Sequence, residues 1–440
     1  MKNLVKKYNQ SEAILMVSLY PKKAELYSSG TSGVASYAKN ITTRMQSPVI
    51  VLADKNKRPH FYEEQGVLVN RCFTKSKLSL WLQVLKQVVR FNKVNRVVIQ
   101  FDFGMYGSLL ATALIVPFLL ALKLLGKKVY IVSHHVITDV FKLRGHVGLG
   151  NSWFDTIKGN VYNFLFKAFY RLLGLLSEKI VVLEEPLKAM LAEFVPQHKI
   201  SVIAHGVDTK LKPMNKIKAR QQLNLKKNSF LIMYFGFVNW FKGADIFAQT
   251  FKNRKQLLNK NVSALIAGGE SPTMKGKRFY QKYFNQVLKT VSDSPVVNMT
   301  GYIPQEDIRK YFSAADLIVF PYRHFMTASG VMSLALSYGK PFIVSHELSQ
   351  MFDSPDFKKT LTEVGLKKSD IVFNLSKYSC LHTAENVLRN GIKRKMARLA
   401  LIEREKRDYS LTAKAYDNLV EIKPRYLFGK SLIFHYNSGR

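Results

Sequence analysis

Two adjacent histidines, His134 and His135, are placed where they could perform acid–base chemistry. They directly follow residues 129–133, a short apolar run that is typical of a β-strand. A histidine at a strand end can exchange a proton near neutral pH or donate a hydrogen bond to a developing oxyanion. A structural role is the alternative, and the sequence does not decide which of the two acts. Zinc is not indicated, because no Cys, Asp or Glu ligands cluster with the pair.

A second candidate site lies at Ser329 and Gly330, which open a predicted helix after the apolar strand 317–320. The helix is expected to stop at Gly339, and Pro341 begins the next strand. The free N–H groups and the dipole at a helix start favour anions, and in parallel sheets such helices follow the carboxyl ends of strands. Ser329 and Gly330 are therefore predicted to bind the phosphates of a ligand.

A loop with two glycines, residues 30–34, follows the first predicted strand and precedes a helix. Glycine lets backbone amides approach a ligand closely, and the helix start again favours negative charge. Gly33 is therefore a candidate phosphate contact. The alternative is an ordinary turn before a helix.

The elements that must position these residues alternate between strand and helix, which predicts parallel sheets with crossover helices. The expected strands are 14–19, 48–52, 96–101, 129–133, 180–183, 200–204, 230–235, 263–267, 296–300, 317–320 and 342–345. We therefore predict an α/β protein with two Rossmann-like, doubly wound parallel-sheet domains that face a ligand-binding cleft. The expected divisions are 1–205, 206–410 and a final helix and tail at 411–440, with a polar hinge at 205–229.

Composition favours a folded protein with polyanionic partners. A chain of 440 residues is too long for one ordinary core, and a hydrophobic content of 47% argues against extensive disorder. The formal net charge of +37 predicts contact with nucleic acid, an anionic membrane surface or phosphorylated substrates, with a merely solvated basic surface as the alternative. Cys72 and Cys380 form no metal or redox motif, so a reducing, cytoplasmic location is expected.

One strongly apolar stretch, residues 108–125, approaches the length of a membrane span. Pro117 lies in its middle and Lys123 near its end, and a predicted strand follows. We therefore expect a buried or surface-docked helix. No secretory signal is expected, because the apolar run 13–19 is short and is better explained as the first strand.

Several motifs occur in an order that resembles the GT-B glycosyltransferases of the family 4 type, the glycosyl transferases group 1. The resemblance extends over about residues 14–420 and rests on residues 203–208, 234–238, 242–245, 267–270, 301–307 and 320–345. The chain is a variant: the family usually carries two glutamates near Met326 and Leu334, and no carboxylate occurs between Asp316 and Glu347. Phe237 also stands where many members have an arginine.

The resemblance implies a donor site for a nucleotide-diphosphate sugar on the C-terminal domain. Its predicted phosphate-binding residues are Gly33, Gly236, Lys242, Gly268, Arg323, Ser329 and Gly330. Tyr302 and Ile303 are expected near the base, and Arg323 is expected to replace the cation missing at Phe237. The family's histidine near the reacting sugar corresponds to His134 or His135. No metal is implied, and a C-terminal helix is expected to cross back to the N-terminal domain.

The leading interpretation is a hexosyltransferase that moves a sugar to a lipid-linked or polysaccharide acceptor during cell-surface polysaccharide synthesis. The resemblance implies retention of anomeric configuration. Residues 160–176 mix aromatic residues with Lys167 and Arg171, so they could form an amphipathic helix on the anionic inner face of a membrane or a core helix. The alternatives are a catalytically inactive GT-B scaffold that serves as a partner subunit, a sugar-nucleotide epimerase, and a nucleic-acid binder, for which no sequence motif is present.

Overall fold

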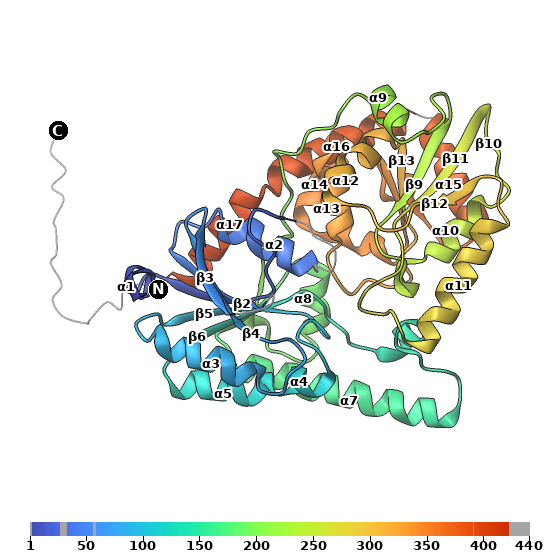
Figure 1. The fold of residues 1–440 in the computed structure, drawn as a ribbon. Coiled ribbons are helices and arrows are strands. Elements are labelled where there is room, and N and C mark those ends of the chain that lie inside the picture. The colour runs from blue at the N-terminus through green and yellow to red at the C-terminus, as the bar shows by residue number, and fades with distance from the viewer. Residues whose placement is uncertain (1, 27–32, 56–58, 390, 422–440) are drawn as a thin grey trace, which may run out of the picture.

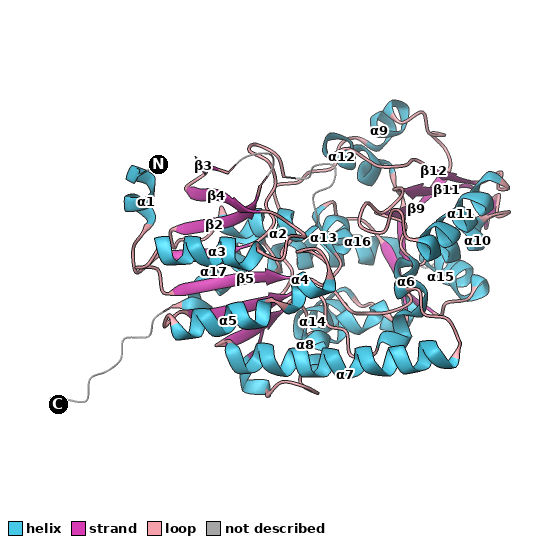
Figure 2. Ribbon diagram, turned by 60° about the horizontal axis from the view of Figure 1, so that its bottom comes forward, coloured by secondary structure: helices cyan, strands magenta, loops and turns pink. Residues whose placement is uncertain are grey.

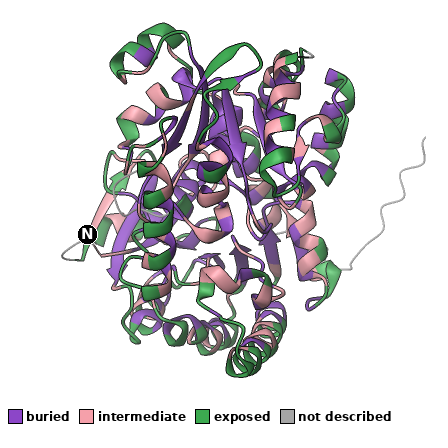
Figure 3. Cartoon of the chain, turned by 90° about the vertical axis from the view of Figure 1, so that its right-hand side faces the viewer, coloured by how far each residue is buried: buried purple, intermediate pink, exposed green. Residues whose placement is uncertain are grey.

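The computed structural model describes residues 2–26, 33–55, 59–389 and 391–421. These residues form two α/β domains, each built on its own twisted sheet (Figure 1). The sheets account for most of the buried ribbon, whereas the exposed residues lie on the surrounding helices and loops (Figure 3). The predicted fold class is thereby confirmed.

The first sheet has eight strands in the order β3-β4-β2-β1-β5-β6-β7-β8. Its strands are β1 (Ile14–Val17), β2 (Val49–Asp54), β3 (His60–Glu64), β4 (Val67–Phe73), β5 (Arg96–Phe101), β6 (Lys128–Ser133), β7 (Lys179–Val182) and β8 (Ile200–Val202). All neighbouring pairs are parallel except β3 and β4. The order reverses between β1 and β5, as in doubly wound sheets.

Helices cover both faces of this sheet. They are α1 (Lys2–Tyr8), α2 (Gly33–Thr42), α3 (Leu80–Arg90), α4 (Leu109–Ala113), α5 (Ile115–Leu124), α6 (Arg144–Val147), α7 (Trp153–Leu176) and α8 (Glu185–Leu191), with 3₁₀ turns η1 (Val140–Leu143) and η2 (Gln197–Lys199). Alternate residues of β1 point to opposite faces. Leu15 and Val17 join the core beneath α3 and α5, whereas Ile14 and Met16 join the core beneath α2.

The second sheet runs β10-β11-β9-β13-β14-β15, with β12 also paired to β11. Its strands are β9 (Phe230–Phe235), β10 (Gln256–Leu257), β11 (Lys260–Ala267), β12 (Val297–Met299), β13 (Leu317–Phe320), β14 (Phe342–Ser345) and β15 (Val372–Phe373). The central strands are parallel, and only β10 is antiparallel to its neighbour. The central apolar strands are buried, as expected for a sheet covered on both faces.

The helices of the second domain form two packed groups, with α10 and α11 in one and α13, α14 and α16 in the other (Figure 1). The elements are α9 (Lys216–Gln222), η3 (Trp240–Lys242), α10 (Ala244–Phe251), α11 (Arg278–Ser292), α12 (Gln305–Ala314), α13 (Gly330–Ser337), η4 (Leu348–Asp353), α14 (Pro355–Val364), η5 (Lys368–Asp370), α15 (Lys377–Arg389) and α16 (Ile392–Lys406). The last helix, α17 (Tyr409–Val420), packs on α2 of the first domain, where Tyr416 and Tyr37 share a hydrogen bond of 3.0 Å.

Four strands were not predicted: β3, β4, β10 and β15. β4 (VLVNRCF) is a buried strand, but its run contains Asn70 and Arg71, which hid its apolar character. Arg71 is buried because its guanidinium donates to the backbone carbonyls of Asp54, Tyr20 and Pro21. The prediction of 205–229 as a simple hinge also needs correction, since α9 lies within it and packs on α12 of the second domain.

The apolar stretch 108–125 forms two helices, α4 and α5, instead of one. Ser108 caps α4 by accepting a hydrogen bond from the backbone N–H of Ala111, and Leu114 separates the two helices. Within the part of the chain that the structure describes, no helix combines the length and the apolar character needed to cross a membrane. The structure thus has helical residues in front of a strand, as expected, but in two short helices where one was predicted.

A buried arginine holds the two domains together. Arg407, between α16 and α17, donates to both carboxylate oxygens of Glu184 in the first domain, at 2.6 and 3.1 Å. Its Nε lies 2.6 Å from Asp356 and 3.4 Å from Glu403. Burial raises the pKa of Glu403 to about 7, so part of the negative charge around Arg407 is removed near neutral pH. The guanidinium is thus the central cation of a charge cluster that crosses the domain boundary.

Replacing Arg407 with methionine is expected to destabilise the protein by about 3–5 kcal/mol, because Glu184 would stay buried without its partner. Urea unfolding monitored by circular dichroism measures this change. The control is Arg398→Met, which removes an exposed arginine from the preceding helix α16. Equal stability of the two variants would contradict the assignment.

Candidate functional site

The carboxyl ends of the two sheets meet at the domain interface. The segment after β6 contacts the segment after β13: the N–H of Val136 donates to the carbonyl of Met326 at 2.8 Å, and His135 forms an isolated bridge with Thr327. Loops at the carboxyl ends of parallel strands are where doubly wound folds bind ligands. The predicted site residues of both domains therefore face the same interface.

In the second domain, three strand-end loops approach one another through glycines. Gly236 follows β9 with a φ of +108°, and an ideal Cβ on it would lie 3.6 Å from the Nζ of Lys242 and 3.4 Å from Val331 in α13. A Cβ on Gly268, which follows β11, would collide with the carbonyl oxygen of Gly236. The structure thus brings Gly236, Gly268, Lys242 and the start of α13 together.

Lys242 ends the turn η3. Among the residues that the structure describes, no carboxylate forms an ion pair with its Nζ. Burial lowers the pKa of this amine from its usual 10.5 to about 8. A desolvated amine without a partner is stabilised when a phosphate binds beside it.

Arg323 has a different environment. Its two terminal nitrogens bind the two carboxylate oxygens of Asp245 at 2.8 and 2.5 Å, and Nη1 also donates to the carbonyl of Trp240 at 2.7 Å. Its backbone N–H donates to the carbonyl of Phe241 at 2.7 Å. The predicted role as a free phosphate-binding cation therefore conflicts with the geometry, because Asp245 already neutralises the charge. Arg323 instead fixes the turn that carries Lys242.

Ser329 and Gly330 lie at the start of α13, as predicted. The Ser329 side chain caps the helix by accepting from the N–H of Met332 at 3.2 Å, and its hydroxyl also bonds with Tyr322 at 3.0 Å. The hydroxyl is therefore already engaged within the protein. The space beside Gly330 is open, since nothing lies within 4 Å of an ideal Cβ there. A ligand can approach the first-turn amides on this side.

Tyr302 and Ile303 follow β12 on the same edge of the second sheet. Tyr302 is 44% exposed and its ring stacks with Phe237 at a centroid distance of 6.4 Å and an angle of 20°. Ile303 is buried. The backbone of Gly301 and Tyr302 touches Gly269, so this aromatic pair lies next to the glycine loops. Phe237, which departs from the family pattern, thus forms one half of an aromatic surface.

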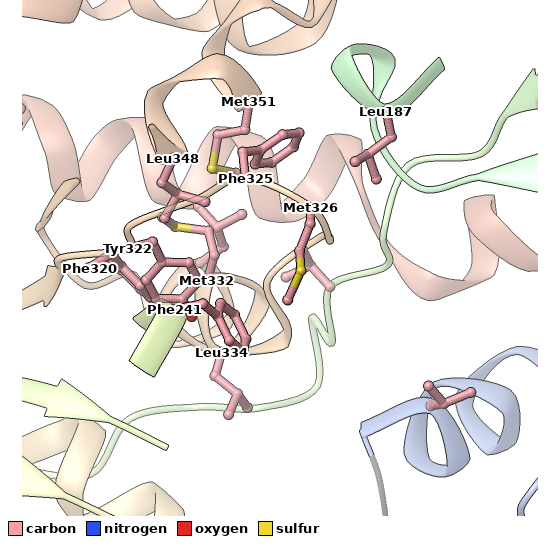
Figure 4. Close-up of a cluster of buried hydrophobic side chains, with 14 of the residues drawn as sticks. Leu187, Phe241, Phe320, Tyr322, Phe325, Met326, Met332, Leu334, Leu348 and Met351 are labelled. Atoms are coloured by element: carbon pink, nitrogen blue, oxygen red, sulfur yellow. The ribbon is translucent and has the colours of Figure 1, made fainter. Parts of the chain in front are cut away.

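The two positions where glutamates are usual carry buried apolar side chains. Met326 is 3% and Leu334 is 9% exposed. Figure 4 shows both in a buried apolar cluster with Tyr322, Phe325 and other side chains around the β13–α13 connection. Carboxylates at these two positions would be desolvated in such a cluster. The apolar core around positions 326 and 334 therefore accommodates Met326 and Leu334 and would not accommodate charged glutamates.

In the first domain, the structure distinguishes the two candidate histidines. His134 is buried, its Nε2 lies 2.7 Å from Oε1 of Gln100, and its ring meets Tyr37 edge-on. Burial lowers the pKa of His134 far below its usual value. His134 is consequently a neutral core residue, and the predicted catalytic role remains only for its neighbour.

His135 is partly exposed and paired with an acid. Its Nδ1 lies 2.6 Å from Oδ1 of Asp102, and the two side chains are 20% and 21% exposed. Asp102 directly follows β5, and Thr327 of the second domain lies opposite His135. A carboxylate close to Nδ1 can orient an imidazole whose other nitrogen is used in acid–base chemistry. Asp102 was missed in the sequence, although its place one residue after a strand end was the available signal.

His146 lies nearby and was also missed. Burial first, and then the neighbouring charges of His135, Lys277 and Lys242, lower its pKa to about 4. Its ring meets Phe241 edge-on at 5.1 Å, so α6 of the first domain touches η3 of the second. The histidines of one domain and Lys242 of the other therefore belong to one region.

Two further predictions concern the first-domain loop and metal binding. Most of the loop 30–34 lies outside the described residues; Gly33 begins α2, and nothing lies within 4 Å of an ideal Cβ on it. Its phosphate contact stays a prediction.

Within the ranges that the structure describes, no group of three or more His, Cys, Asp or Glu side chains is arranged to hold a metal ion.

Comparison with known proteins agrees with this geometry. Residues 229–354 match the family described as glycosyl transferases group 1. The lipopolysaccharide 1,2-N-acetylglucosaminetransferase of Salmonella typhimurium is 25% identical over 169 residues, which is 38% of this chain and 44% of that protein. The match thus spans less than half of the curated relative.

Solved structures share the whole architecture. HepE of Anabaena, in complex with UDP and glucose, has a TM-score of 0.63 with 14% identity, over 93% of this chain and 99% of that one. Sucrose-phosphate synthase of Thermosynechococcus elongatus has a TM-score of 0.66 with 15% identity, over 93% and 98%. The chain therefore has the GT-B fold, and its residues 229–354 are similar to the glycosyl transferases group 1.

Proposed function

We propose that this glycosyltransferase moves a hexose from a nucleotide-diphosphate sugar to a lipid-linked or polysaccharide acceptor in cell-surface polysaccharide synthesis. It acts in the cytoplasm at the inner face of the membrane. The observation that carries the proposal is the convergence of Lys242, Gly236 and the start of α13, opposite His135 and Asp102.

The donor lies on the second domain. Its diphosphate contacts Nζ of Lys242 and the first-turn amides of α13, while Gly236 and Gly268 leave room for the backbone to approach it. The base lies toward the aromatic pair of Phe237 and Tyr302. The complex of HepE with UDP and glucose supports a uridine nucleotide as the first donor to test.

The reaction breaks the bond between the anomeric carbon and the diphosphate oxygen, and the electron pair leaves with the diphosphate. Lys242 and the helix amides stabilise that charge, so the protein supplies no nucleophile and the chemistry uses no metal. The acceptor oxygen then bonds to the anomeric carbon, with retention of configuration, and its proton passes to the departing diphosphate or to Nε2 of His135. His135 Nε2, oriented through Asp102, accepts a proton or donates a hydrogen bond at the reacting sugar.

Charge and comparison together support this choice of acceptor. The named activity of the Salmonella relative supports an acceptor of the lipopolysaccharide kind. The net charge of +37 supports substrates that carry phosphate or lie on an anionic surface. A lipid-linked saccharide diphosphate combines both properties.

A thermal-shift screen with UDP-, GDP- and ADP-sugars tests the donor class. One nucleotide family is expected to raise the melting temperature by several degrees, since ligand at about one hundred times its Kd adds about 2.7 kcal/mol of stability. EDTA should leave the shift unchanged. Absence of any shift across the screen would contradict the proposal.

Replacing Lys242 with methionine is expected to weaken UDP binding about 10- to 100-fold, the range for a lost charged hydrogen bond. UDP affinity of the native protein should also fall as pH rises above about 8, because the amine then loses its proton. Lys242→Arg should abolish that pH dependence while keeping affinity. Calorimetric titration between pH 7 and pH 9 measures both effects, and Lys289→Met on the exposed face of α11 is the matched control.

Turnover distinguishes the two histidines. Asp102→Asn and His135→Gln are expected to lower kcat about 10²- to 10⁴-fold with little change in UDP affinity. His134→Gln should mainly lower the melting temperature, since His134 is buried against Gln100 and Tyr37. Hydrolysis or transfer of the donor identified in the screen provides the assay. An unchanged kcat for His135→Gln would reject its assignment.

A second candidate function, a nucleotide-binding scaffold without turnover, is favoured by the buried Met326 and Leu334 at the usual glutamate positions. The same measurements separate the two functions. A donor-induced thermal shift, with neither hydrolysis nor transfer in the presence of membrane-extracted acceptor lipids, would indicate the scaffold. Transfer by the purified chain alone would exclude it.

A further inference from the structure

Large apolar side chains are exposed mainly on one layer of the first domain. Figure 2 shows α3, α5 and α7 side by side on the face turned toward the viewer, with α4 beside them. Neighbouring helices of this layer touch each other, so their outer surfaces are continuous. We call the outer surface of α4, α5 and α7, together with Leu78, Leu82 and Val89 of the α3 region, the apolar face.

The longest helix, α7, is apolar toward solvent as well as toward the core. Phe154, Ile157, Val161, Phe164 and Leu175 are 66%, 52%, 50%, 70% and 66% exposed. Their spacings of three, four, three and eleven residues place them along one stripe of the helix. The helix begins with Trp153, whose ring stacks on that of Phe154 at a centroid distance of 3.6 Å. A surface helix in contact with water alone would carry polar residues along such a stripe.

The neighbouring pair α4–α5 continues the same surface. Leu110, Leu120 and Leu124 are 58%, 48% and 81% exposed, while Phe118, Leu119 and Leu122 on the other side of α5 are buried. These helices thus also carry apolar side chains on both sides. Exposed apolar patches of this extent mark interaction surfaces.

The charges on these helices have almost one sign. Exposed lysines and arginines occur at Lys86, Lys123, Lys158, Lys167 and Arg171. Helices α3, α4 and α5 carry no acidic residue, and the one acid of α7, Asp155, closes a capping box with Ser152. Such a surface complements a negatively charged partner that also accepts apolar groups. A symmetric contact with a second copy would instead place cations against cations.

We propose that the apolar face docks this protein on a bilayer that contains anionic lipids. Leu124, Phe164 and their neighbours enter the boundary between headgroups and acyl chains, and the lysines remain at the level of the lipid phosphates. The inference rests on the proposed function in one respect, since a membrane-borne acceptor explains why an enzyme would need this surface.

Docking at this face also connects the bilayer to the reaction site. The chain between His135 and α7 crosses to the second domain, where Gly145 lies against Trp240 and Gly148 against Phe279, too close for a Cβ. The membrane-facing helix therefore starts directly after the segment that borders Lys242. An acceptor anchored in the bilayer beside α7 is within reach of His135 without leaving the membrane.

The test is co-sedimentation of the purified full chain with phosphatidylcholine vesicles that contain or lack phosphatidylglycerol. Binding is expected only with the anionic lipid, and it should weaken as salt is added. The double substitution Leu124→Gln/Phe164→Gln is expected to lower the partition coefficient about tenfold or more. Both side chains are mostly exposed, so the fold should be retained, which circular dichroism verifies.

Two matched controls isolate the face. Tyr378→Gln/Leu411→Gln removes exposed apolar residues of α15 and α17 and should bind vesicles like the native protein. Lys158→Gln/Lys167→Gln should weaken binding several-fold, whereas Lys282→Gln/Lys289→Gln on α11 changes the net charge equally and should have a smaller effect.

The proposal is overturned if the native chain does not bind anionic vesicles at low salt, or if both members of each pair of variants bind equally. Concentration-dependent dimerisation that the Leu124→Gln/Phe164→Gln variant abolishes, without vesicle binding, would assign the face to a second copy. Vesicle binding needs no donor sugar. A failure here therefore leaves the thermal-shift result intact, and a failed donor screen leaves vesicle binding intact.

Discussion

The relative placement of the two domains depends on the ion cluster around Arg407. This cluster joins the two domains through charges that neither domain could bury alone. Glu184 belongs to the first domain, whereas Asp356 and Glu403 belong to the second. A carboxylate buried without its partner is strongly unfavourable, so the cluster favours one relative placement of the domains. That placement brings the loops after β6 and β13 into contact.

Within that placement, the two cations near the interface have opposite roles for a physical reason. Both terminal nitrogens of Arg323 bind Asp245, and its guanidinium carbon lies 4.8 Å from the centroid of the Trp240 ring. Its charge is therefore neutralised, and its contacts stabilise the turn that carries Lys242. Lys242 ends the turn that Arg323 fixes, and no carboxylate of the described residues forms an ion pair with it; burial lowers its pKa to about 8. The uncompensated charge is the one that gains from an anionic ligand. The same contrast separates His134, enclosed in the core, from His135, which is paired with Asp102 at the surface.

Much of the fold followed from sequence pattern because central parallel strands must be apolar on both faces. Phe230–Phe235, Leu317–Phe320 and Phe342–Ser345 have the predicted bounds. The prediction failed at the edge strands β3, β10 and β15, and at the interior strand β4, which includes Arg71. Edge strands need less apolar surface. Arg71 is buried because backbone carbonyls surround its guanidinium, which a linear pattern does not reveal.

The sequence by itself determined the fold class, the glycine loops, the helix start at Ser329 and the presence of a lysine at 242, since each depends on local residue type and spacing. Tertiary structure decided which charges are free. It paired Arg323 with Asp245, placed Asp102 beside His135, and turned the apolar stripes of α5 and α7 outward. The reason is that neutralisation and exposure depend on residues far apart in the chain, and only the folded packing sets those distances.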